Sequence, residues 1–178
     1  MKVTLVRHAE TEENFLGIIQ GRSNPLLNDT GRRQVLRLKQ KIQSIHYDVC
    51  YTSPLIRCFE TALVLVGDRV EIIRDDRIIE RNMGELEGRS KEEYNFFQFW
   101  NYKKNRSDYG IESLHDLFER CESFLNELTE KYPDKHVLIV THYGPYRALR
   151  HLLLKHPIQG NLLDGKIENC SIEEFDYS

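Results

Sequence analysis

The chain opens with Lys2-Val3-Thr4-Leu5-Val6-Arg7-His8, a short apolar stretch that ends in a cation and an imidazole. Its β-branched and apolar residues predict a strand over residues 2–7. A second run, Val137-Leu138-Ile139-Val140, is apolar throughout, which is typical of a strand covered on both faces. Together the two stretches predict an α/β fold built around a mainly parallel sheet.

Strands and helices are expected to alternate along the rest of the chain. Further strands are predicted over residues 48–53 and 70–74, and one or two edge strands over residues 167–177. Helices are predicted from apolar spacing and capping residues, over residues 29–42, 54–66, 113–131 and 145–154. No linker or repeat divides the sequence, so we expect a single domain over residues 1–178, folded as a three-layer α/β/α sandwich.

The composition excludes several classes of protein. The 178 residues are 40% hydrophobic and 30% charged, and the formal charge of −3 gives no basic bias toward nucleic acid. No apolar run approaches the roughly 20 residues that span a membrane, and the first residues lack a secretory pattern. The four cysteines form no CxxC pair and are expected to be reduced thiols. We therefore expect a cytoplasmic protein that binds neither nucleic acid nor a membrane.

Three of the predicted strands end in residues that suit an anionic substrate. Arg7-His8 ends the first strand, Thr52-Ser53-Pro54 ends the second with Arg57 close behind, and Thr141-His142-Tyr143-Gly144 follows the buried strand. The carboxyl ends of parallel strands share one edge, where ligands bind and where helix N-termini add positive dipole ends. The sequence therefore predicts a cleft in which two arginines and two histidines meet.

A loop that carries acids is predicted over residues 78–88. Gly84 and Gly88 lie four positions apart in a chain with few glycines, which favours a shaped loop over a helix. Glu80, Glu85 and Glu87 lie in this loop, and a carboxyl group beside a cationic cleft can supply a proton.

These segments together resemble the histidine phosphatase superfamily, which includes the cofactor-dependent phosphoglycerate mutases. Five blocks match the family's motifs in order: Arg7-His8-Ala9-Glu10-Thr11 with Asn14, Gln20-Gly21-Arg22-Ser23-Asn24-Pro25-Leu26 with Gly31 and Gln34, Thr52 through Ala62, Glu80 with Gly84 through Gly88, and Val140 through Gly144. The blocks cover nearly the whole chain, so the fold implied is phosphoglycerate mutase-like.

The resemblance implies a metal-independent mechanism through phosphohistidine, without a cofactor. His8 would be the nucleophile, neutral and held in one tautomer by a hydrogen bond to its other ring nitrogen. Glu80 would protonate the leaving oxygen and then activate water. The phosphoryl oxygens would be bound by Arg7, Arg57 and His142, with Asn14 and the backbone N–H of Gly144 assisting. Substrate contacts are also expected from Gln20, Gly21 and Tyr143.

The favoured function is a phosphomonoesterase that acts on a small phosphorylated metabolite, as a monomer or homodimer. Glu80 and His142 lie only 62 positions apart, which is short for the insertions that shield a mutase site from water. Mutase activity and a non-catalytic module that binds a phosphorylated ligand are the alternatives. A metal site of His8, His142 and Glu80 is disfavoured because Arg7 and Arg57 would repel a cation.

Two features leave specificity open. Ala9, Leu86 and Tyr143 depart from the family pattern, and a phenol beside the second histidine can alter substrate access. Residues 94–104 are aromatic and then basic, and they can form either a lid or a segment packed on the core. We expect most of these aromatic side chains to pack, with one or two facing the cleft. The physiological substrate does not follow from the sequence.

Overall fold

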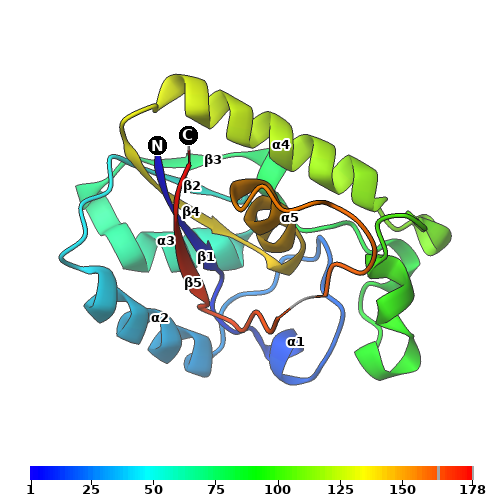
Figure 1. Ribbon diagram of the computed structural model, residues 1–178. Coiled ribbons are helices and arrows are strands. Elements are labelled where there is room, and N and C mark those ends of the chain that lie inside the picture. Colours follow the sequence, from blue (N-terminus) through cyan, green and yellow to red (C-terminus); the bar gives the residue numbers. More distant parts are fainter. Residues whose placement is uncertain (164, 178) are drawn as a thin grey trace.

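A five-stranded sheet forms the centre of the computed structural model, which describes residues 1–163 and 165–177 (Figure 1). The strands lie in the order β3-β2-β4-β1-β5. Their bounds are Lys2–Arg7 for β1, Val49–Thr52 for β2, Ile72–Arg74 for β3, His136–Thr141 for β4 and Ile172–Asp176 for β5. Strands β1 to β4 are parallel and β5 pairs antiparallel with β1 at the edge, so the prediction of a mainly parallel sheet is confirmed.

Helices cover both faces of the sheet, as the sandwich prediction requires. Helices α2 (Asp29–Ile42) and α3 (Ile56–Val66) pack together on one face, against a core that includes Val6, Cys50 and Leu138. Helices α4 (Leu114–Lys131) and α5 (Tyr143–Leu153) cover the other face, against Leu5, Tyr51 and Ile139. Neighbouring strand residues alternate between the two cores because successive side chains point to opposite faces of a sheet.

Two helices begin at other residues than predicted. The helix expected from Pro54 begins at Ile56, because Ser53 accepts the N–H of Leu55 and the side chain of Asn24 accepts the N–H of Ile56. These two bonds hold Pro54 in the turn before the helix. Helix α5 begins at Tyr143, earlier than Pro145, which therefore lies in its first turn. In the tail, only β5 forms among the described residues 165–177.

Two irregular segments run past the carboxyl ends of the strands. Residues 84–110 contain short 3₁₀ turns, and Phe99 and Trp100 of this segment are buried in the core. The side chains of Phe96 and Phe97 lie outside the described part of the chain. Residues 154–163 and 165–171 lie between α5 and β5, shown in orange in Figure 1, and Asn101 pairs with Asn161 where the two segments meet.

A short helix, α1 (Glu12–Phe15), lies on the way from β1 to α2 and was not predicted. Thr11 caps it by accepting the N–H of Asn14, and Asn14 accepts the N–H of Thr11 in return. This reciprocal capping fixes the backbone directly after His8. In the part of the chain that the structure describes, every helix is too short or too polar to cross a membrane.

Candidate active site

The carboxyl ends of β1 and β4 place the two sequence-predicted histidines side by side. The strands pair in register from Lys2 to Arg7, and the N–H of His8 donates to the carbonyl oxygen of Thr141 at 2.8 Å. His8 and His142 directly follow these strands, and their ring centroids are 5.1 Å apart. Both imidazoles therefore sit at the sheet edge that the sequence indicated.

His8 is held in a single tautomer. Its Nδ1 lies 2.7 Å from the carbonyl oxygen of Ala9, and a carbonyl only accepts, so Nδ1 carries the proton. Burial, with Arg57 and Arg7 nearby, holds the pKa of His8 well below its usual value. The ring is therefore neutral at pH 7, with its lone pair on Nε2. Because His8 lines the main cavity of the site, this nitrogen is available as a nucleophile.

His142 is fully buried, and both of its ring nitrogens are engaged. Arg57 Nε donates to Nδ1 at 3.2 Å, so the proton of this neutral ring must be on Nε2, which lies 2.7 Å from the hydroxyl oxygen of Ser53. Burial and the charge of Arg57 hold the pKa of His142 well below its usual value. In this arrangement His142 orients Arg57 and packs on His8. The contact of His142 with the phosphoryl oxygens, which the resemblance implies, stays a prediction.

Two buried arginines supply the positive charge beside His8. Arg57 is held by the carbonyl oxygens of Ser23 at 2.6 Å and Gly21 at 2.9 Å, which belong to the second sequence block. Arg7 donates from Nη1 to the carbonyl oxygen of Ile167 at 2.8 Å, while its buried Nε has no partner among the described residues. Both guanidinium groups line the cavity, and the unpaired Nε of Arg7 is a ready donor for an oxyanion.

Glu80 is fixed against the start of α5. Its carboxylate accepts the backbone N–H groups of Arg81 at 2.8 Å, Gly144 at 3.0 Å and Tyr143 at 3.1 Å. A Cβ at position 144 would lie 2.6 Å from Oε1 of Glu80, so a side chain there would displace the Glu80 carboxylate. The N–H of Gly144, which the sequence assigned to the phosphoryl group, is thus directed at Glu80. Glu80 lines the cavity, which agrees with an acid or base role.

The other acids of the loop take different positions. Glu87 accepts the N–H groups of Arg22 at 2.9 Å and Met83 at 3.1 Å through the same oxygen. A Cβ at Gly21 would lie 2.0 Å from that oxygen, so Glu87 packs directly on the second block. Glu85 is exposed. Neither lines the cavity, which separates them from Glu80.

The cavity has a volume of about 380 Å³ and is lined by several more of the predicted residues. These are Asn14, Gln20, Gly21 and Tyr143. The amide oxygen of Asn14 accepts from Asn169 at 3.1 Å, which leaves the NH₂ group of Asn14 as the part that can donate to a ligand. Gln20 is buried, and its amide oxygen has no partner among the described residues.

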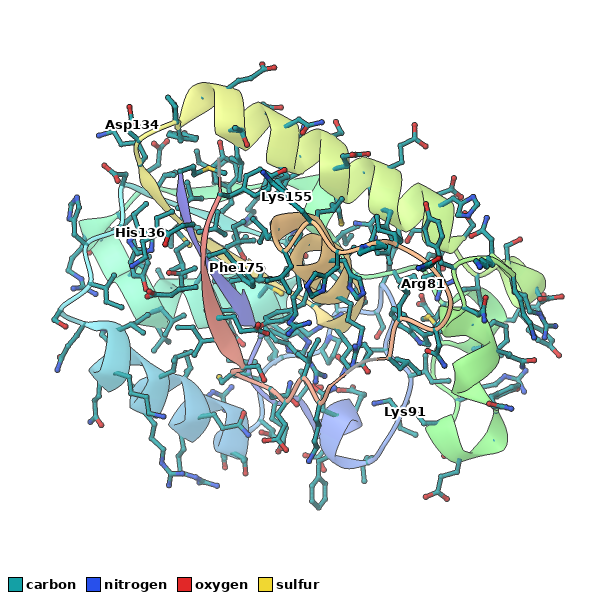
Figure 2. The ribbon with its side chains drawn as sticks, viewed as in Figure 1. Arg81, Lys91, Asp134, His136, Lys155 and Phe175 are labelled. Atoms are coloured by element: carbon teal, nitrogen blue, oxygen red, sulfur yellow. The ribbon has the colours of Figure 1, made fainter. Side chains whose placement is uncertain are left out.

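Besides Trp100, six further lining residues were not predicted as site residues: Ile18, Ile19, Arg81, Met83, Lys91 and Leu163. Arg81 is 1% exposed and donates to the carbonyl oxygens of Glu112 and Phe99, both at 2.7 Å. Its Nη2 is buried without a partner among the described residues. Burial lowers the pKa of Arg81 to about 10, so the group stays charged at pH 7. Figure 2 shows Arg81 and Lys91 on the side of the molecule where residues 84–110 lie.

Trp100, also in the cavity lining, shows which part of the aromatic segment faces the cleft. It is 5% exposed, and its ring meets Tyr143 edge-on at a centroid distance of 5.5 Å. Phe99 is instead fully buried in the core. The expectation that most aromatics pack, with one or two at the cleft, is confirmed for these two residues. Arg81 directly follows Glu80 in the sequence, and this position could have indicated a place in the site. Lys91 and Leu163 lie in no predicted motif that would indicate one.

Residues 1–163 and 165–177 contain no group of three or more histidine, cysteine, aspartate or glutamate side chains placed to hold a metal ion. The charged side chains that line the cavity are mostly cations, namely Arg7, Arg57, Arg81 and Lys91, with Glu80 as the one acid among the described lining residues. Such a lining suits an anion of high charge.

Comparison with known proteins agrees with this geometry. The model of the histidine phosphatase superfamily (branch 1) matches residues 3–178. Phosphoserine phosphatase 1 of Hydrogenobacter thermophilus is 36% identical over 161 residues, which cover 86% of this chain and 76% of the relative. Phosphoglycerate mutase-like protein 4 of Arabidopsis thaliana is 33% identical, covering 83% of this chain and 69% of the relative. A mutant phosphoserine phosphatase of Entamoeba histolytica, solved in complex with phosphoserine, superposes with a TM-score of 0.86 at 26% identity, covering 99% of this chain and 91% of that one.

The chain therefore belongs to the histidine phosphatase superfamily, branch 1. Its fold is that of the phosphoglycerate mutase-like phosphatases, as predicted. The protein is a histidine phosphatase, a hydrolase of phosphate monoesters.

Proposed function

We propose that His8 carries the phosphoryl group and that Glu80 moves the proton. In the first step, Nε2 of His8 attacks phosphorus, the bond from phosphorus to the ester oxygen breaks, and Glu80, which enters this step as the protonated acid, gives that oxygen its proton. In the second step, Glu80 takes a proton from water, the water oxygen bonds to phosphorus, and the bond to Nε2 breaks. The observation that carries this assignment is the hydrogen bond from Nδ1 of His8 to the carbonyl oxygen of Ala9. It leaves Nε2 as the ring nitrogen with a free lone pair, on a residue that lines the cavity.

Arg7 and Arg57 would stabilise the charge on the transferring group. Their guanidinium groups are buried and anchored by carbonyl oxygens, so they are placed before the reaction begins. Preorganised donors of this kind strengthen as charge develops in the transition state. His142 would act through Arg57, because Nδ1 of His142 accepts a hydrogen bond from Nε of Arg57. Asn14, Gln20, Gly21 and Tyr143 would contact the substrate from the cavity wall.

The substrate we propose carries a carboxylate in addition to its phosphate. Four cationic side chains face one carboxylate in the cavity, an excess of about three positive charges. A phosphate monoester supplies about two negative charges at pH 7. The remaining charge, with the unpaired Nη2 of Arg81 and the ammonium group of Lys91, suits one more anionic group. O-phosphoserine fits this description, and relatives named phosphoserine phosphatase favour it.

A pair of matched substrates tests this proposal. O-phosphoethanolamine is O-phosphoserine without the carboxylate, so only the second anionic group differs. We expect kcat/KM to be at least about tenfold higher for O-phosphoserine, the effect of one hydrogen bond to a charged group. Arg81→Met should remove this preference, and Arg89→Met, at an arginine that bonds the carbonyl oxygen of Glu85, should retain it. Equal kcat/KM for the two substrates in the wild type would contradict the carboxylate subsite.

The mutase alternative is separated by the products. A relative named phosphoglycerate mutase-like keeps this alternative open, and 3-phosphoglycerate also carries a carboxylate. We expect 3-phosphoglycerate to give inorganic phosphate without its isomer, with or without a bisphosphate primer. Formation of the isomer that depends on the primer would assign the mutase reaction instead. Background phosphate release from every ester in a broad panel would favour a binding module.

We also propose a cytoplasmic location. The support is the chemistry of the cysteines: all four are free, and three of them are buried. Oxidising compartments favour disulfides, and a chain of this size there would commonly use them.

A further inference from the structure

Arg147 is a buried cation that the proposed mechanism leaves unused. It lies in α5, one turn after Tyr143, and is 2% exposed. Nη1 donates to the carbonyl oxygen of Leu162, and Nη2 donates to that of Gly165 and to the phenol oxygen of Tyr143, each at 2.8 Å. Burying a guanidinium group is costly, so three such bonds in one fork indicate a specific task.

The carbonyl groups that Arg147 binds belong to the segment between α5 and β5. Its described residues, 154–163 and 165–171, form no helix or strand, so side chains and neighbouring backbone must hold it. The N–H of Leu162 donates to the carbonyl oxygen of Trp100 at 2.8 Å, and farther along Arg7 binds the carbonyl oxygen of Ile167. Arg147 lies between these two attachments and ties α5 to the stretch that contributes Leu163 to the cavity.

Tyr143 connects the same arginine to the reacting groups. The Cζ atom of Arg147 lies 4.6 Å from the centre of the phenol ring, and that of Arg7 lies 5.3 Å from it. The ring also meets Trp100, and the backbone N–H of Tyr143 donates to Glu80. Tyr143 is therefore fixed on several sides, with Arg147 holding both its ring and its hydroxyl group.

Trp100, Tyr143 and Leu163 form what we call the apolar wall of the cavity. Arg147 touches two of its three parts, Tyr143 directly and Leu163 through the carbonyl group of Leu162. We propose that Arg147 is a positioning residue that fixes the apolar wall and so determines which leaving groups the site accepts. This inference rests on the proposed phosphatase function. Arg7, His8 and Arg57 hold the phosphoryl group in that function, and the wall, beside Arg81 and Lys91, contacts the rest of the ester.

Arg147→Lys tests the proposal, because lysine keeps the charge but lacks the planar fork that binds three oxygens. The measurement is kcat/KM for O-phosphoserine and for the bulkier 1-naphthyl phosphate. We expect the ratio of the two values to fall about tenfold, mainly through a higher KM for O-phosphoserine. The control is Arg150→Lys, the same exchange one turn away on α5, where the side chain pairs with Glu173. That control should leave the ratio unchanged.

Trp100 gives a second readout that needs no turnover, because it is the only tryptophan of the chain. In Arg147→Lys, acrylamide should quench its fluorescence more strongly and the emission should shift to the red, whereas Arg150→Lys should match the wild type. This readout separates the role of Arg147 in fixing the wall from the proposed phosphatase function. A wild type without activity on any ester would end the proposed function, and quenching would still test the wall.

An equal loss of kcat/KM on both substrates with unchanged quenching would overturn the proposal, since Arg147 would then serve stability alone. If Arg147→Lys does not fold, Leu163→Ala opens the wall without removing the arginine. It should lower the same ratio, and Tyr143→Phe, which loses only the bond to Arg147, should raise the quenching of Trp100. An unchanged ratio in the first or unchanged quenching in the second would equally overturn it.

Discussion

Two groups of residues line the same cavity, and they are built in different ways. The strand-edge group, Arg7, His8 and Arg57, lies at the carboxyl ends of β1 and β2, with Arg57 in the first turn of α3, and the parallel sheet fixes its position. The loop group, Arg81, Lys91, Trp100 and Leu163, lies in irregular segments that are held by individual hydrogen bonds such as that from Leu162 to Trp100. The comparison suggests that the sheet carries the chemistry of the family, whereas the loops carry the specificity of this chain.

If the strand-edge group performs the reaction, the largest effect belongs to its nucleophile. His8→Ala should lower kcat by at least about 10⁴-fold and remove acid-labile phosphate from the protein. His136→Ala is the matched control, because His136 lies in Figure 2 far from Arg81 and bonds Thr4. A His8→Ala protein that kept more than a few per cent of the activity would place the chemistry elsewhere.

Glu80 joins the two groups, since it lies beside Arg81 yet is bound by the start of α5. Glu80→Gln should slow phosphorylation of the enzyme by an alkyl phosphate about 10²- to 10⁴-fold, because an alkoxide needs the proton. A nitrophenyl phosphate should be much less affected in the burst phase, since nitrophenolate leaves without one. Glu85→Gln, at an exposed acid of the same loop, should show no dependence on the leaving group. The reverse pattern would move the acid role to Glu85.

Arg57 also tests the difference between the two groups, because it bonds His142 and the carbonyl oxygens of Gly21 and Ser23. Arg57→Ala should lower kcat about 10²- to 10³-fold on every ester, the usual effect of removing a transition-state donor. The loss should not depend on the leaving group, in contrast to the loss in Glu80→Gln. A change in substrate preference with unchanged kcat would instead assign Arg57 to the loop group.

The smallest expected effect is on stability. Burial holds the pKa of His142 well below its usual value, so the folded protein leaves it neutral while the unfolded chain binds a proton near pH 6.5. Stability from this group is complete above pH 6.5 and is lost as the pH falls below it. Between about pH 7.5 and 5.5, the wild type should lose about 1.4 kcal/mol more free energy of unfolding than His142→Gln. Urea unfolding at both pH values measures this, and equal losses would show that folding does not lower the pKa of His142.

The sequence predicted the sheet and the strand-edge group because both depend on short stretches of consecutive residues. The continuous apolar run from Val137 to Val140 is typical of a buried strand, and the residues that follow a parallel strand lie at its carboxyl edge. Arg57 was placed correctly although its helix begins later than predicted, because position in the first turn survives a shift of two residues.

The loop group could not be predicted in the same way. Leu163 reaches the cavity because its neighbour Leu162 bonds Trp100, more than 60 positions away, and no periodic pattern encodes that contact. The bonds of Gly144 to Glu80 and of Ser53 to His142 are of the same kind. They depend on the assembled loops, so the sequence carries no signal for these hydrogen-bond partners within the site.

The most direct test of the proposed mechanism is to identify the atom that receives the phosphoryl group. The phosphoenzyme can be accumulated with Glu80→Gln, quenched in alkali, and examined by phosphorus and nitrogen correlation NMR with peptide mapping. Because Nδ1 of His8 donates to Ala9, we predict phosphate on Nε2 of His8. Phosphate on Nδ1 of His8 or on His142, or turnover without any phosphohistidine, would contradict the account.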